Sequence, residues 1–78
     1  MTTRRLVIDD GEDVELRGSL ALITDGSEVW RVPPPNGASD GWTDARLDGG
    51  TVTAFSWSCY RVTIDVATGA ELSRVFTK

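Results

Sequence analysis

The chain has 78 residues, of which 12 are acidic and 8 are basic, and its formal net charge at pH 7 is −4. An acidic chain repels phosphate backbones, so we do not expect it to bind nucleic acid. The length allows one hydrophobic core, and a chain that is 40% hydrophobic and 26% charged has the composition of a folded protein. These numbers predict a single domain over residues 1–78.

Cysteine usage and the lengths of the apolar runs bear on the compartment. Cys59 is the only cysteine, so the chain cannot form an internal disulfide, whereas small secreted domains usually carry several. The apolar run near the N-terminus spans only residues 6–8, which is too short for the core of a signal peptide. No stretch approaches the roughly 18 apolar residues of a membrane span. We therefore expect a soluble cytoplasmic protein, complete as written, that makes no contact with a membrane.

In the first half of the chain, alternating apolar and polar residues separated by turns rich in glycine and aspartate indicate β-strands. Asp25-Gly26 is a strong signal for a tight hairpin turn. Gly18 interrupts the second apolar run, and because a glycine within a strand often marks a bulge, this strand is expected to curve. The three strands are predicted at residues 3–8, 14–24 and 28–32.

In the second half, three consecutive prolines end the third strand, because proline cannot donate a backbone hydrogen bond to a ladder. A long loop follows, and Asp40 is suited to cap a short helical turn over residues 40–47. Residues 51–66 are rich in β-branched and aromatic side chains but exceed the usual strand length of about 3–10 residues, so we expect a bend or break near Ser58. Turns at 48–50 and 67–69 and a last strand at 71–77 complete the pattern.

These elements predict an all-β fold, namely a small antiparallel meander of five to six strands that forms a barrel or a two-layer sandwich. A single helical turn near residues 40–47 is the only expected departure. Trp30 and Trp57 lie within predicted strands and are expected to fill the core, and Cys59 is expected to behave as a small buried hydrophobe. The predicted aliphatic core consists of Leu16, Leu20, Leu22, Val62, Ile64 and Leu72.

The residue types that build a catalytic centre are scarce in this chain. It has no histidine, which removes the commonest general base and metal ligand. Ser56 and Ser58 have no base at a suggestive spacing. The acidic run at residues 9–13 lacks the alternating ligands and the distant glutamate of a calcium-binding loop. We therefore expect no enzyme activity, no cofactor and no metal ion.

The loop at residues 33–42 is the expected recognition site, since a long loop on a rigid β scaffold can vary without unfolding the domain. Trp42 is its largest apolar residue; it either plugs an open end of the fold or is exposed to a partner, and exposure is predicted. The triple proline is interpreted as a strand terminator rather than as a ligand for an aromatic groove. The residues expected to contact a partner are Pro34, Pro35, Asp40, Trp42 and Arg46.

Residues 48–78 resemble two outer strands and turns of one β-propeller blade of the quinoprotein-like repeat type. The resemblance consists of Asp48-Gly49, the strand at 52–54, and Asp65 followed by Ala67-Thr68-Gly69 and Glu71-Leu72. It covers less than half of the chain, and a propeller needs several blades, whereas this chain has length for fewer than two. Neither the propeller fold nor its cofactor is therefore expected.

Two functions remain open. The acidic charge and the three tryptophans favour a non-catalytic protein-interaction module, such as an antitoxin, an immunity-type protein, an adaptor or a subunit. Its partner would be another protein, and the chain itself would be a monomer or a homodimer formed through an edge strand. The alternative is a small-molecule-binding or weakly catalytic β-barrel that uses Asp, Glu, Arg and Tyr side chains in its mouth. A cavity of about 300 Å³ or more, lined by Trp and Arg, would favour that alternative.

Overall fold

The computed structural model describes residues 3–12, 17–37 and 40–77, and it confirms the all-β class. These residues form no α-helix, and none of their segments is a helix long and apolar enough to cross a membrane. Seven strands are present, one more than the upper end of the prediction. They are β1 (Arg4–Ile8), β2 (Leu20–Thr24), β3 (Ser27–Val32), β4 (Trp42–Asp48), β5 (Thr51–Ser56), β6 (Tyr60–Asp65) and β7 (Glu71–Phe76).

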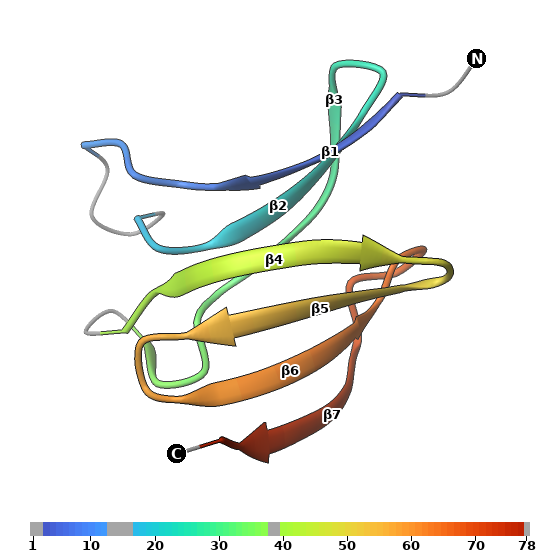
Figure 1. Cartoon of the computed structure of the whole chain (residues 1–78). Coiled ribbons are helices and arrows are strands. Elements are labelled where there is room, and N and C mark those ends of the chain that lie inside the picture. The colour runs from blue at the N-terminus through green and yellow to red at the C-terminus, as the bar shows by residue number, and fades with distance from the viewer. Residues whose placement is uncertain (1–2, 13–16, 38–39, 78) are drawn as a thin grey trace.

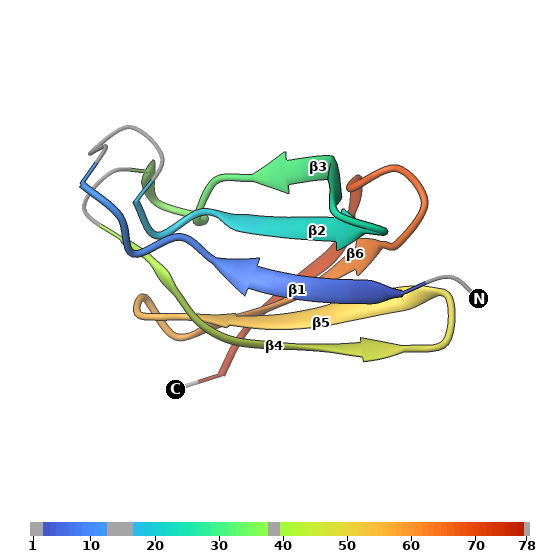
Figure 2. The same cartoon turned by 90° about the horizontal axis from the view of Figure 1, so that it is seen from above.

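The strands form two antiparallel meanders, one with the order β1-β2-β3 and one with the order β4-β5-β6-β7. The sheets pack against each other with β1 in contact with β4, and the backbone N–H of Trp42 donates to the carbonyl of Gly18 at 3.1 Å on this side (Figures 1 and 2). At the opposite side β3 and β7 are both edge strands that do not pair with each other, so the barrel is not closed. The arrangement is a two-layer, sandwich-like fold.

Side chains from both sheets meet in one core, and the predicted strand faces are largely confirmed. The prediction that Leu72 belongs to the core is wrong, because 58% of its surface is exposed. Leu72 lies on β7, which no strand of the other sheet covers. Leu16, also predicted for the core, lies outside the described residues. The buried cluster is Leu20, Leu22, Trp30, Trp42, Val52, Ala54, Val62 and Ile64, so four of the six predicted aliphatic residues belong to it.

The predicted second strand at 14–24 is wrong for residues 17–19, the described residues that precede β2. The strand β2 begins only at Leu20, and Gly18 lies in a turn with a φ of 83° rather than in a strand bulge. The N–H of Gly18 donates to the carbonyl of Asp9 at 2.7 Å, and the N–H of Asp9 donates to Ser19 O at 2.9 Å, which closes the β1–β2 connection. A positive φ suits glycine because it has no Cβ. The start of the predicted strand, residues 14–16, lies outside the described residues.

The predicted helical turn over residues 40–47 is also wrong, because this segment forms β4. It pairs with β5 along its length, from Trp42 opposite Ser56 to Asp48 opposite Thr51, with a register shift between Trp42 and Asp44. Capping potential at Asp40 is a weak local preference, whereas pairing with a neighbouring strand satisfies the whole backbone. The pattern of Ala45 and Leu47 alternating with polar residues fits a strand that has one face on the core.

The break predicted near Ser58 is confirmed, and it changes the environment of its neighbours. Strand β5 ends at Ser56 and β6 begins at Tyr60, and Cys59 in the intervening turn has a φ of 70°. Trp57 is therefore carried out of the sheet and is 77% exposed, and Cys59 is half-buried. The expectations that Trp57 fills the core and that Cys59 lies buried on a central strand are both wrong.

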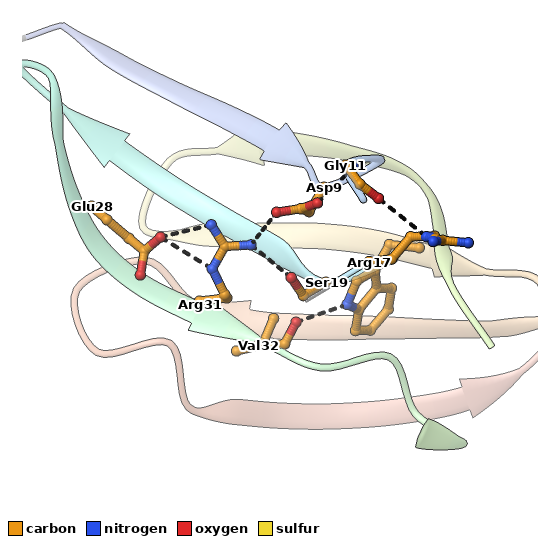
Figure 3. A network of polar contacts seen from close by, with 8 residues as sticks. Asp9, Gly11, Arg17, Ser19, Glu28, Arg31 and Val32 are labelled. Carbon is orange, nitrogen blue, oxygen red and sulfur yellow. Dashed lines mark hydrogen bonds and ion pairs between the residues drawn. The ribbon is translucent and has the colours of Figure 1, made fainter. Parts of the chain in front are cut away.

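Arg31 on β3 ties the three-stranded sheet together through polar contacts (Figure 3). One guanidinium nitrogen donates to Asp9 Oδ2 at 3.2 Å and to Ser19 Oγ at 2.7 Å, and the other donates to Glu28 Oε1 at 2.8 Å. The hydrogen bond with Glu28 raises the pKa of Arg31, so the side chain stays charged. A planar guanidinium can serve several acceptors at once. This network holds the start of the acidic β1–β2 connection against β3.

Candidate functional site

The strand β7 is the most open part of the four-stranded sheet. It pairs only with β6, and every residue from Glu71 to Phe76 is exposed. Two of its apolar side chains, Leu72 and Phe76, are each 58% exposed, and Val75 is 43% exposed. An edge strand presents unpaired backbone N–H and C=O groups to which another extended chain can bind. β7 therefore combines a free sheet edge with an unusual density of exposed apolar side chains.

The face of β7 that points towards the other sheet carries an aromatic and charged cluster. Residues opposite each other on antiparallel strands share a face, and Phe76 is opposite Tyr60 while Arg74 is opposite Val62. The rings of Tyr60 and Phe76 meet edge to face, with centroids 5.5 Å apart, and the guanidinium carbon of Arg74 lies 5.5 Å from the Tyr60 centroid. Arg74 also pairs with Glu71 Oε1 at 2.7 Å. The cluster is held in place without the cover of a second sheet.

Beside this cluster lies a half-open groove of about 240 Å³, which we call the proline groove. Its floor is the apolar face of β6, and the wall opposite is the triple proline that leaves β3. Pro34 is buried in this wall and Pro35 is half-buried. The indole N–H of Trp42 donates to the carbonyl of Val32 at 3.3 Å, which joins the wall to the core. The lining residues are Val32, Pro33, Pro34, Pro35, Trp42, Val62, Ile64, Gly69, Glu71 and Arg74.

A second candidate lies at the β5–β6 turn, where Asn36, Asp40, Trp57 and Ser58 line a shallow pocket of about 210 Å³, which we call the Trp57 pocket. The Asp40 carboxylate accepts hydrogen bonds from Ser58 Oγ at 2.6 Å, from the backbone N–H of Ser58 at 3.1 Å, and from the N–H groups of Gly41 and Asn36 at 2.8 and 3.2 Å. Asp40 thus joins the end of the proline loop to the turn that presents Trp57.

The environment of Asp40 fixes its charge. Partial burial raises the pKa of this carboxyl, but the hydrogen bonds from Ser58 Oγ and from three backbone N–H groups lower it by more, so the net pKa lies below the ordinary 3.8. A carboxylate with a lowered pKa is a weaker base. The arrangement is suited to holding a turn and to presenting a negative charge.

We expect the free energy of unfolding to contain a contribution from Asp40 that is present above about pH 4 and is lost as the pH falls through the lowered folded-state pKa. The sign follows because the unfolded chain binds the proton more tightly than the folded chain. Urea unfolding of the wild type and of Asp40→Asn between about pH 7 and about pH 3 measures it. The stability difference between the two proteins should shrink towards low pH.

Asp48→Asn is the matched control for this comparison, because it removes one carboxylate at an exposed position, the last residue of β4. It changes the net charge by the same amount as Asp40→Asn does, so it shows the effect of removing one negative charge elsewhere on the chain. If the stability difference of Asp40→Asn shrinks towards low pH no more than that of Asp48→Asn, the hydrogen bonds to Asp40 do not favour its charged form.

The structure brings three of the five predicted partner-contacting residues together, since Pro34, Pro35 and Trp42 line the proline groove, whereas Asp40 and Arg46 lie apart from it. Trp42 is only 5% exposed, so the prediction of an exposed Trp42 is wrong and the residue plugs the core. Pro34 is likewise buried, and Pro35 contributes to the groove wall. Asp40 uses its carboxylate within the loop, and Arg46 is exposed on β4, where its register partner is Thr53 of β5. The loop supplies walls for two hollows rather than one continuous contact surface.

Sequence reasoning missed the two features that the structure exposes, β7 and Trp57. The predicted last strand does form, as β7. The missing information was that the first sheet has only three strands, which leaves β7 uncovered. For Trp57, the available signal was the expected break near Ser58, since a tryptophan next to a tight turn leaves the strand pattern.

Comparisons with known proteins identify the family of this chain but indicate no function. No curated protein and no solved structure matches this chain significantly. One family model matches residues 2–76, which is nearly the whole chain. The seven strands described above all lie within the matched residues. The chain therefore belongs to the family described as Domain of unknown function (DUF7957).

Proposed function

We propose that this protein is a non-catalytic protein-interaction module that binds an extended segment of a partner protein along β7. The observation that carries the proposal is that every residue of this edge strand is exposed, including three apolar side chains, Leu72, Val75 and Phe76. Addition of a strand to a sheet edge gains affinity from main-chain hydrogen bonds and specificity from pockets for alternate side chains. The proline groove beside Arg74 is placed to receive such a side chain.

The dimensions of the groove favour a protein segment over a small molecule. Sites for small molecules are usually concave cavities of about 300–1,000 Å³ that enclose most of the ligand. The proline groove is smaller, about 240 Å³, and is half-open. It contains Trp42 and Arg74, as the alternative function requires, but Trp42 is buried in the core and Arg74 is paired with Glu71. A single side chain from a partner fits this space better than a whole ligand.

The proposal extends to the role and the compartment. An antitoxin, an immunity-type protein, an adaptor and a subunit of a larger assembly all mask or join another protein without chemistry of their own. The net charge of −4 supports a partner with a basic surface, because opposite fields speed association and select against wrong partners. The single, unpaired Cys59 supports a reducing compartment, and we propose the cytoplasm.

Affinity capture from the native cell extract tests this function with the double variant Leu72→Ser/Val75→Ser. We expect the variant to lose a protein that the wild type retains, because exposed apolar residues at the centre of an interface supply much of its binding energy. Val29→Ser is the control, since Val29 is an exposed apolar residue on the other edge strand, β3. It should retain the partner. Equal capture by all three proteins would contradict binding along β7.

A second copy of the chain is the other occupant that an edge strand admits. Light scattering over a range of protein concentrations distinguishes it. A dimer that forms with the wild type and is abolished by Leu72→Ser/Val75→Ser would identify a homodimer through β7 and would contradict a different protein as the partner at this edge.

A further inference from the structure

Trp57 is the most exposed large apolar side chain in the described part of the chain. Its exposed fraction is 77%, whereas those of Trp30 and Trp42 are 8% and 5%. The core does not account for it, and it is not part of β7 or of the proline groove. Tryptophan is enriched among the residues that dominate binding energy at protein interfaces. An exposed tryptophan on a defined turn therefore needs a separate explanation.

The turn that carries Trp57 is held from both of its ends. The backbone N–H of Trp57 donates to the carbonyl of Gly41 at 2.9 Å, and Asp40 accepts two hydrogen bonds from Ser58. At the other end, the N–H and the hydroxyl of Thr77 both donate to the carbonyl of Cys59, at 2.7 and 3.0 Å. A side chain presented from a pre-ordered backbone loses less conformational entropy on binding.

The chemistry of the Trp57 pocket points to a positive ligand. The face of an indole ring carries partial negative charge and attracts a cation within about 6 Å of its centroid. Among the described residues that line it, Asp40 is the only charged one, and it is negative. Its two oxygens already accept four hydrogen bonds, so it contributes its charge rather than a free acceptor. The amide of Asn36 and the hydroxyl of Ser58 complete a polar rim.

We propose that the Trp57 pocket binds the cationic side chain of an arginine or a lysine from the partner protein, stacked on the Trp57 ring beside the Asp40 carboxylate. This inference rests on the proposed function, because it takes the partner to be a protein. It agrees in sign with the net charge of the chain, 12 acidic against 8 basic residues. It also gives the acidic protein a defined point at which a basic partner is recognised.

Titration with N-acetyl-arginine amide, followed by the three indole N–H signals in nuclear magnetic resonance spectra, tests this site on the purified chain. We expect the Trp57 signal to shift in a saturable way. The indoles of Trp30 and Trp42 donate to the carbonyls of Val66 and Val32 and serve as internal controls that stay unchanged. N-acetyl-citrulline amide has the same shape without the charge and should produce little shift. An equal shift with citrulline, or none with arginine, would overturn the proposal.

Four variants locate the interaction. Trp57→Leu should weaken arginine binding by about three- to tenfold, and Trp57→Phe by less, because the smaller ring retains a π face. Asp48→Asn removes a negative charge outside the pocket and should leave the affinity within about twofold. Asp40→Asn should weaken binding more than Asp48→Asn does. If Asp40→Asn disturbs the turn, the affinity of the wild type for the arginine amide is measured at different salt concentrations instead. Binding that does not weaken between about 0.02 and about 0.5 M salt would contradict a role for charge.

A small quaternary ammonium compound offers the same chemistry from another source, and tetramethylammonium distinguishes it. Binding of tetramethylammonium more tightly than the arginine and lysine amides would show a small-molecule site and would overturn the assignment to a protein side chain. Failure of this inference is separable from failure of the proposed function, because the titration needs no partner and the capture experiment changes only β7. If the wild type captures a partner through β7 but does not bind the arginine amide, only the inference about the Trp57 pocket is contradicted. If the arginine amide binds but no partner is captured through β7, the proposed function of β7 is contradicted.

Discussion

We expect Trp42→Ala to lower the free energy of unfolding by about 3–5 kcal/mol, the usual cost of truncating a buried aromatic residue. Trp42 is 5% exposed and contacts the core formed by both sheets. Its indole also donates to the carbonyl of Val32, so the truncation removes a hydrogen bond as well as packing. Since a domain is stabilised by only about 5–15 kcal/mol in total, this single change removes a large share of it. Urea unfolding followed by circular dichroism measures the loss.

The control for this prediction is Trp57→Ala, which removes the same side chain from an exposed position. It should change the free energy of unfolding by no more than about 0.5 kcal/mol. The two variants therefore separate a tryptophan that supports the fold from one that is free to bind. Equal unfolding midpoints for Trp42→Ala and the wild type would show that the first tryptophan does not close the core.

The second large effect is expected for Gly69→Ala, at about 2–4 kcal/mol, from overpacking and backbone strain together. Gly69 has a φ of 78°, and a Cβ at this position would lie 2.8 Å from Cγ of Trp30. Trp30 is not free to retreat, because it is buried and its indole donates to the carbonyl of Val66 at 2.8 Å. Either the β6–β7 turn or the tryptophan must therefore move. The urea midpoint reports the cost.

Gly49→Ala provides the matched comparison for this prediction. Gly49 also has a positive φ, 62°, but nothing lies within 4 Å of the Cβ that alanine would add. The free energy of unfolding of this variant should fall only by the cost of placing alanine in a left-handed backbone conformation, about 1–2 kcal/mol. The difference between the two glycine variants isolates the contact with Trp30. If both variants lower the free energy of unfolding by the same amount, Gly69 in the β6–β7 turn does not contact Trp30 as closely as in the structure.

The strands that carry β-branched residues in alternation could be predicted from the sequence, because both their period and their turns are local signals. The Asp25-Gly26 turn and the break near Ser58 are examples, and both are confirmed. The strand β4 could not be predicted in the same way. Its alternation of apolar and polar residues is limited to Ala45 and Leu47, and it forms a strand because β5 provides a partner from Trp42 to Asp48.

The exposure of the tryptophans was harder to predict than the strands. Trp42 stands beside a proline-rich loop, where sequence gives no sign that the chain folds back and packs it between two sheets. Trp57 has apolar and aromatic neighbours typical of a core strand, and only the turn that begins after Ser56 brings it to the surface. Both outcomes depend on how two sheets meet, which is not a local property.

The order of the strands has a consequence for the speed at which the chain folds. Every ladder in both meanders joins strands that follow each other in the sequence, and the connections between them are short, apart from the acidic segment between β1 and β2. Proteins dominated by such local contacts fold faster than β-proteins whose strands pair across the chain, because fewer long loops must close before pairing is rewarded. Only the docking of residues 4–32 onto residues 42–76 closes a large loop, through contacts such as that of Trp30 with Val66. We therefore expect hairpins to form first and the meeting of the two halves to limit the rate.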